Sequence, residues 1–154
     1  PDCIKSIKNG QKVQIRNLKA TRPWQHVIEI LNGYLRLAKK LSLNKKMNGE
    51  SFNFGPSNSE IVSVGKILTH IKKNWSGFKW IKVGNSIKNE TDLLVLNTDK
   101  AKKILSWNTR LKVPEAVKLT IEWYKEFYKN MNYKSRINLL TKKQILNYHN
   151  KYKI

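Results

Sequence analysis

The stretch Ala20-Thr21-Arg22-Pro23-Trp24-Gln25-His26-Val27 is the most distinctive in the chain, because it brings a cation, an indole, an amide and an imidazole together. Apolar residues recur at helical spacing over 27–41, so the stretch predicts a loop that leads into a long helix. An arginine just before a helix N-terminus can bind a phosphate together with the backbone N–H groups of the first turn. The stretch therefore predicts either an anion-binding site at Arg22 or an ordinary helix start in which Trp24 and His26 serve as packing residues.

The residues on the N-terminal side of this stretch predict three short segments. Residues 1–8 predict a short helix, 12–16 alternate as a strand, and 17–23 form a loop. The second half of the chain continues in the same manner. Short strands are predicted at three places: 51–54, 78–83 and 93–96.

Helices are predicted between and after these strands, over 61–71 with Ser59 as the N-cap, over 99–105, and over 114–128. Thr141 and Gln144 form a capping box that predicts the start of a last helix. Strands that alternate with helices favour an α/β or an α+β arrangement.

The chain has 154 residues and a formal net charge of +21, from 31 Lys and Arg against 10 Asp and Glu. Such a balance is typical of a nucleic-acid-binding protein. The kind of charge argues against that interpretation, because 26 of the cations are lysines and only five are the arginines that read guanine edges and clamp phosphates. We therefore interpret the charge as a Lys-rich solvated surface and keep a basic nucleic-acid-binding module as the alternative.

Motifs that carry chemistry by themselves are missing from the sequence. The three histidines lack metal-ligand spacing, and the single cysteine, Cys3, excludes an internal disulfide framework and suits a reducing cytosol. No Gly-x-Gly-x-x-Gly loop, phosphate loop, serine nucleophile elbow or long apolar window is present. Glu122 and Glu126 lie one turn apart on a Lys-rich helix, which is typical of a solvated face. We expect no metal site, no membrane span and no complete catalytic site.

Taken together, these segments resemble the C-terminal half of the CDP-glucose 4,6-dehydratases, members of the extended short-chain dehydrogenase/reductase superfamily. The Arg-Pro-Trp-Gln-His string at 22–26 is its most specific part, because sister nucleotide-sugar dehydratases have an Arg-Asp-Trp-like version. Other matching segments follow in the family's order: Val13-Gln14-Ile15-Arg16-Asn17, Gly33-Tyr34-Leu35, Asn53-Phe54-Gly55-Pro56, Leu105-Ser106-Trp107, Thr120-Ile121-Glu122-Trp123-Tyr124 and Thr141-x-x-Gln144-Ile145.

The resemblance implies an α/β fold, namely the C-terminal part of an extended short-chain dehydrogenase/reductase (Rossmann-type) fold. Residues 1–154 would be the substrate-binding portion with the terminal elements of the nucleotide-binding layer, and the N-terminal NAD-binding half would be absent. The whole enzyme would convert CDP-glucose to CDP-4-keto-6-deoxy-glucose for deoxysugar and lipopolysaccharide biosynthesis in the cytoplasm, with a tightly bound NAD. The family's glycine-rich NAD loop and Tyr-x-x-x-Lys catalytic pair do not occur in this sequence, so we expect the chain to be inactive alone.

The resemblance also implies which residues bind substrate. Arg22 matches the family's residue that pairs with the diphosphate of the sugar nucleotide, and Asn58 matches an amide that contacts the nucleotide. Three consecutive residues match the strand beside the base and ribose: Gln14, Ile15 and Arg16. Glu90 falls in the family's His-Glu-Ala segment, here Asn89-Glu90-Thr91, so the substrate-binding imidazole of that segment is missing.

The partners implied are a CDP-sugar and either the missing NAD-binding half or a second copy of the chain, with no membrane and no specific nucleic acid. A sister activity, such as an epimerase or a dehydratase that uses another nucleotide, is a third option.

Overall fold

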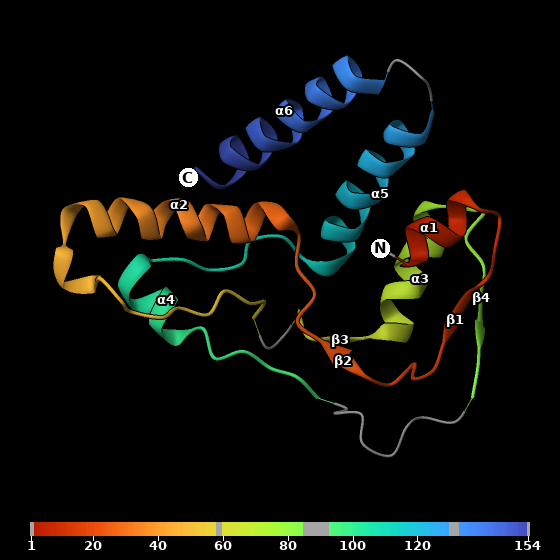
Figure 1. The fold of residues 1–154 in the computed structure, drawn as a ribbon, viewed down its shortest axis with the longest axis horizontal. Coiled ribbons are helices and arrows are strands. Elements are labelled where there is room, and N and C mark those ends of the chain that lie inside the picture. The colour runs from red at the N-terminus through yellow and green to blue at the C-terminus, as the bar shows by residue number, and fades with distance from the viewer. Residues whose placement is uncertain (1, 58–59, 85–92, 130–132, 154) are drawn as a thin grey trace.

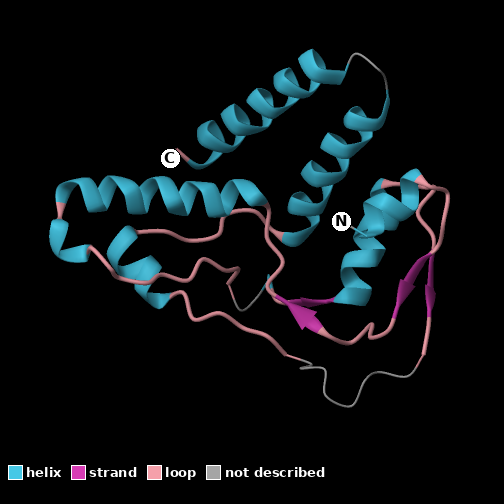
Figure 2. Ribbon diagram, in the orientation of Figure 1, coloured by secondary structure: helices cyan, strands magenta, loops and turns pink. Residues whose placement is uncertain are grey.

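A computed structural model describes residues 2–57, 60–84, 93–129 and 133–153 (Figure 1). Helices dominate, with short strands between them (Figure 2). The elements in chain order are α1 (Asp2–Lys8), β1 (Val13–Ile15), β2 (Thr21–Arg22), α2 (Val27–Leu43), the 3₁₀ turn η1 (Lys45–Met47), β3 (Val62–Ser63), α3 (Val64–Asn74), β4 (Trp80–Lys82), α4 (Asp99–Leu105), α5 (Val113–Lys129) and α6 (Tyr133–Tyr152).

The described strands form two small sheets of two strands each. Strand β1 pairs in parallel with β4, in the register Val13 to Trp80. Strand β2 pairs antiparallel with β3, which places Arg22 opposite Val62. The predicted strands at 12–16 and 78–83 are therefore confirmed, whereas the predicted loop over 17–23 is wrong at its end, because Thr21 and Arg22 find a partner strand.

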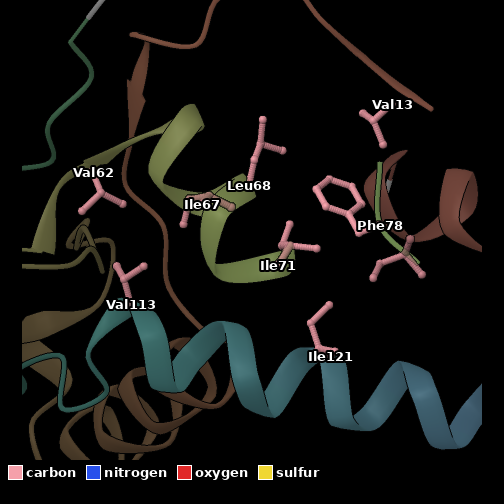
Figure 3. Packing of buried hydrophobic residues seen from close by; sticks show 9 residues of the cluster. Val13, Val62, Ile67, Leu68, Ile71, Phe78, Val113 and Ile121 are labelled. Carbon is pink, nitrogen blue, oxygen red and sulfur yellow. The ribbon is translucent and has the colours of Figure 1, made fainter. Parts of the chain in front are cut away.

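The main core lies where α1, β1, β3, α3 and α5 meet, together with Phe78 from the segment that leads into β4. Side chains from α3 and α5 point toward each other, and the ring of Phe78 closes one side (Figure 3). Its buried members are Ile4, Val13, Val62, Ile67, Leu68, Ile71, Phe78, Val113 and Ile121. These apolar residues recur at helical spacing in α3 and alternate in β1, as the sequence predicts.

Helix α3 begins later than the sequence predicts. Its N-cap is Ser63, whose hydroxyl accepts a hydrogen bond from the Lys66 N–H at 3.3 Å. The predicted cap, Ser59, lies outside the described residues, and Val62 and Ser63 are in a strand. The start predicted at Ile61 is therefore wrong, because pairing with β2 competes with helix formation at these residues.

A second layer is built on α2 and α4, around a small core of Ala101, Leu105 and Trp107. The ring of Phe54 packs edge-on against Trp107, with centroids 5.0 Å apart, and lies against the backbone of α2 at Gly33. A Cβ at Gly33 would be 2.5 Å from that ring, so α2 needs a glycine there.

The strands predicted at 51–54 and 93–96 are wrong, because both segments are loops in the structure. They lie beside each other through side-chain contacts: the Asn53 amide donates to the Asn97 carbonyl at 3.3 Å, and Gly55 packs against Leu96. Burial of the Phe52 and Phe54 rings, which are packed against the core of this layer, explains the apolar alternation without a ladder.

Helices α5 and α6 form a hairpin, and the end of α6 returns beside α2 (Figure 1). The predicted helix start at Thr141 is wrong, since α6 begins at Tyr133. Thr141 and Gln144 instead bind α5: the Trp123 indole N–H donates to the Thr141 hydroxyl at 2.9 Å, and the Gln144 amide donates to the Leu119 carbonyl at 3.0 Å. None of the described helices has the length and apolar composition needed to cross a membrane.

Candidate functional site

Arg22 lies in β2, half-buried, where the small antiparallel sheet leads toward α2. Its guanidinium Nη1 donates a hydrogen bond to the Thr21 carbonyl at 2.7 Å. Pairing with Val62 on β3 fixes the backbone of this arginine. The cation is thus held at a defined place five residues before the first residue of α2.

The residues that follow Arg22 are each bonded to a different part of the fold. The Trp24 indole N–H donates to the Val62 carbonyl at 3.1 Å, and the Gln25 amide donates to the Phe54 carbonyl at 2.7 Å. The Gln25 side-chain oxygen is buried and has no hydrogen-bond partner. We call residues 22–26 the Arg22 stretch; both sheet β2–β3 and the α2–α4 layer hold it in place.

His26 is the N-cap of α2, and its Nδ1 accepts a hydrogen bond from the Ile28 N–H at 3.3 Å. Burial lowers the pKa of the His26 imidazole below its usual value. A neutral imidazole can accept this hydrogen bond, whereas a protonated one cannot. The structure therefore uses Trp24 and His26 as packing and capping residues, which leaves Arg22 as the anion-binding candidate of the stretch.

The other predicted site residues are not gathered around Arg22. Gln14 and Ile15 lie in β1 of the other sheet, with Gln14 exposed and Ile15 packed against the main core. Arg16 directly follows β1 and is exposed. Asn58 and Glu90 lie outside the described residues.

Sequence reasoning missed Glu29, whose carboxylate is completely buried, with an exposed fraction of 0%. Oε1 accepts hydrogen bonds from the backbone N–H groups of Arg110 (2.8 Å) and Leu111 (2.6 Å), and Oε2 accepts one from the Tyr148 hydroxyl (2.8 Å). The Glu29 carbonyl also accepts from the Trp107 indole at 3.1 Å. The available signal was an acidic residue between Ile28 and Ile30, inside the apolar face of the helix.

One face of α2 carries an exposed apolar stripe formed by Val27, Leu31, Tyr34 and Leu35, with exposed fractions of 51–71%. Two grooves border it. One of about 520 Å³ runs between α2 and α6, and another of about 470 Å³ lies at the start of α2 against α5 and α6. An amphipathic helix normally buries its apolar stripe, so this face has the character of an interface.

Among the residues that the structure describes, no group of three His, Cys, Asp or Glu side chains gathers that could hold a metal ion.

Comparison with known proteins shows which proteins this chain is similar to. No family model matches the chain. CDP-glucose 4,6-dehydratase of Salmonella typhimurium is 33% identical over 126 residues, which are 81% of this chain and 35% of that enzyme. This chain is a relative of the nucleotide-sugar 4,6-dehydratases. GDP-mannose 4,6 dehydratase 2 of Caenorhabditis elegans is a more distant relative, 26% identical over 125 residues, covering 73% of this chain and 33% of its own length.

The fold of this dehydratase relative is that of the Rossmann-type epimerases and dehydratases. It superposes on UDP-glucuronic acid 4-epimerase of Bacillus cereus, solved in complex with NAD, with a TM-score of 0.67 and 18% identity, over 86% of this chain and 40% of the epimerase. The chain spans about a third of the length of the curated relatives it matches. The predicted fold class and the predicted similarity to CDP-glucose 4,6-dehydratase are thereby confirmed.

NAD is the cofactor that the resemblance implies, and the described residues of this dehydratase relative do not supply the glycine-rich loop that would hold it. Two described strands lead directly toward helices, β2 toward α2 and β3 into α3, and these are the places where a dinucleotide loop would lie. The first junction has no glycine, and the second has only Gly65, which packs against the Leu18 carbonyl. A backbone cradle for a pyrophosphate needs several glycines, so this part of the chain does not supply one.

Proposed function

We propose that this chain supplies the sugar-nucleotide-binding part of a CDP-glucose 4,6-dehydratase. Identity of 33% over 81% of the chain to an enzyme of that name carries the proposal. Residues 1–154 would act as the substrate-binding portion, and NAD would be held by a separate NAD-binding half. The chemical steps belong to the assembled enzyme, and this chain's own task is to bind and orient the CDP-sugar.

Arg22 is the residue to which we assign the diphosphate. A guanidinium binds phosphate oxygens with paired N–H donors, and its half-buried position weakens screening by solvent ions. The rigid backbone around it supports this role, because a preorganised cation loses little conformational freedom on binding. The charge of +21 draws an anionic substrate toward the whole surface.

The remaining predicted contacts complete the assignment. Gln14, Ile15 and Arg16 would lie beside the base and ribose, Asn58 would contact the nucleotide, and Glu90 would contribute to substrate binding. Because β1 and β2 belong to different sheets, the proposed site would draw Gln14 and Ile15 from one sheet and Arg22 from the other.

The apolar stripe of α2 is the surface to which we assign the NAD-binding half. Its four large side chains lie on one helix face next to the Arg22 stretch, so a partner that covers it would sit beside the bound sugar nucleotide. Water-exposed apolar side chains of this number favour association. We expect the assembly to work in the cytoplasm, where the single Cys3 stays reduced.

Ligand-induced thermal stabilisation tests the assignment. CDP-glucose at about 100 times its Kd should stabilise the chain by about 2.7 kcal/mol, which corresponds to a rise in Tm of about 5–10 °C. Arg22→Ala should abolish the rise. Arg136→Ala, which removes an exposed arginine from α6, should preserve it and controls for the loss of one positive charge.

Comparison of ligands separates the remaining options. CDP-glucose should stabilise more than dTDP-glucose or GDP-glucose, and equal stabilisation by all three would favour a sister activity. The relatives named above act on nucleotide sugars according to their names, which gives the nucleic-acid alternative no support. An undiminished rise in Arg22→Ala would overturn the diphosphate assignment.

A further inference from the structure

The Glu29 carboxylate has an unusual position for a residue of the first helical turn. It is the third residue after the N-cap His26, where a glutamate usually turns back to the N-cap N–H. Here the side chain instead points into the protein and bonds to the segment at 110–111 and to α6. The start of α2 is therefore held by residues that lie far from it in the sequence.

Tyr148 makes the bond that joins α6 to α2. Its ring is buried in a small apolar cluster with Ile28, Leu111 and Ala116. The hydroxyl donates to Glu29 Oε2 at 2.8 Å. Burial, and next the hydrogen bond to Glu29, raise the pKa of the Tyr148 hydroxyl above its usual value, so it remains a donor at any physiological pH.

Three side chains of α6 bind the neighbouring helices through hydrogen bonds. Thr141, Gln144 and Tyr148 lie at helical spacing on one face and bind Trp123, the Leu119 carbonyl and Glu29, respectively. Large apolar residues away from this face are exposed: Leu139 and Leu146. Loss of the Tyr148 hydrogen bond leaves the buried Glu29 carboxylate short of one donor, which weakens the link between α6 and the start of α2.

Helix α6 also forms a wall of the groove at the start of α2. That groove of about 470 Å³ is lined on one side by Gln25, His26 and Val27, and on the other by Thr141, Gln144 and Ile145. Gln25 and His26 of the Arg22 stretch thus face α6 across the groove, and the Tyr148–Glu29 hydrogen bond joins two of the helices that form its walls.

We propose that Tyr148 is a positioning residue for sugar-nucleotide binding: through its hydrogen bond to the buried Glu29 carboxylate, it holds the start of α2 and therefore the backbone of the Arg22 stretch. Tyr148 does not touch the substrate in this mechanism. The inference rests on the proposed function, because it assigns the diphosphate to Arg22.

Tyr148→Phe in the full chain removes the hydroxyl and keeps the ring, and Tyr152→Phe is its matched control, since that hydroxyl bonds only loosely to Glu115 at 3.4 Å. We expect Tyr148→Phe to raise the Kd for CDP about tenfold, the loss that corresponds to one buried hydrogen bond, and Tyr152→Phe to leave it unchanged. Backbone amide exchange of residues 24–28 should become faster in Tyr148→Phe alone.

Two further variants separate positioning from a general loss of stability. Ile71→Val lowers the stability of the main core without touching α2, so it should lower Tm and leave the Kd for CDP unchanged. Glu29→Gln keeps an acceptor for the two backbone N–H groups and offers an amide donor to the Tyr148 oxygen. It should therefore bind CDP nearly as well as the wild-type chain.

The outcomes are distinct. An unchanged Kd and unchanged exchange at 24–28 in folded Tyr148→Phe would overturn the inference, as would an equal rise in Kd for Ile71→Val. If the wild-type chain binds no CDP, the proposed function fails, and faster exchange at 24–28 in Tyr148→Phe still shows that Tyr148 holds the start of α2.

Discussion

The main core and the α2 layer of this chain bury their apolar residues to very different degrees. In the main core, α3 and α5 close over Phe78, which is 1% exposed, and the apolar residues of several elements share one interior. Helix α2 has its buried face against α4 and the loop at Phe54, while Leu35 on its outer face is 71% exposed. The difference teaches that the first region closes over a buried interior, whereas the second has a face suited to a partner.

The largest expected effect breaks the main core. Phe78→Ala removes a fully buried ring and leaves a cavity, so we expect the free energy of unfolding to fall by about 3–5 kcal/mol. Leu35→Ala on the stripe should change it by less than about 0.5 kcal/mol. Urea unfolding of both variants measures the contrast, and similar losses would show that the two regions are equally closed.

Glu29→Ala tests the fully buried carboxylate of α2. It leaves the N–H groups of Arg110 and Leu111 and the Tyr148 hydroxyl without an acceptor, so we expect a loss of about 2–3 kcal/mol. Glu122→Ala is the control, because that glutamate is exposed and pairs with Lys118 at 3.8 Å, a contact worth less than about 1 kcal/mol. Thermal unfolding that gives equal losses for both would contradict the role of Glu29.

Placing charged residues on the apolar stripe of α2 tests whether this face causes association. Leu31→Lys with Leu35→Lys should leave Tm nearly unchanged and reduce self-association of the isolated chain, because the exposed apolar area is lost. Leu139→Lys on α6 is the control at a similarly exposed site. Sedimentation velocity measures the effect, and association that persists in the double variant would assign it to another surface.

The smallest effect is the dependence of stability on pH through His26. Burial lowers the pKa of this imidazole in the folded chain, so the unfolded chain binds the proton more readily. The stabilising contribution of neutral His26 is therefore complete above the unfolded pKa of about 6.5 and is lost as the pH falls below it. His26→Asn keeps an N-cap that does not titrate, and should flatten the decline of Tm between about pH 7 and 5. A parallel decline in both proteins would contradict this.

Local patterns were sufficient where neighbouring residues decide the structure. Helices α1, α4 and α5 follow from apolar spacing, and the Arg22 stretch was predicted to lead into a long helix. The predictions failed where a distant partner decides. Residues 51–54 bury two phenylalanines as a loop against Trp107, and Ser63 rather than Ser59 caps α3 because β2 is nearby.

The candidate site shows the same division. A cation close to a helix start is visible in the sequence, and so Arg22 could be named in advance. Glu29 could not, because its three donors come from residues 81, 82 and 119 positions away, and spacing within α2 says nothing about them. Thr141 and Gln144 were predicted to cap a helix because their spacing is that of a capping box. In the structure their side chains instead form hydrogen bonds with α5, which local spacing does not reveal.

The hydrogen bond between Glu29 and Tyr148 also has a consequence in time. The two residues are 119 positions apart, so during translation at about 5–20 residues per second Tyr148 is made roughly 6–24 seconds after Glu29. Until Tyr148 is made, the Glu29 carboxylate stays in water, because burying it without its full set of donors costs free energy. The first turn of newly made α2 therefore stays incompletely packed for several seconds. During this time a chaperone that recognises exposed apolar helices can bind it.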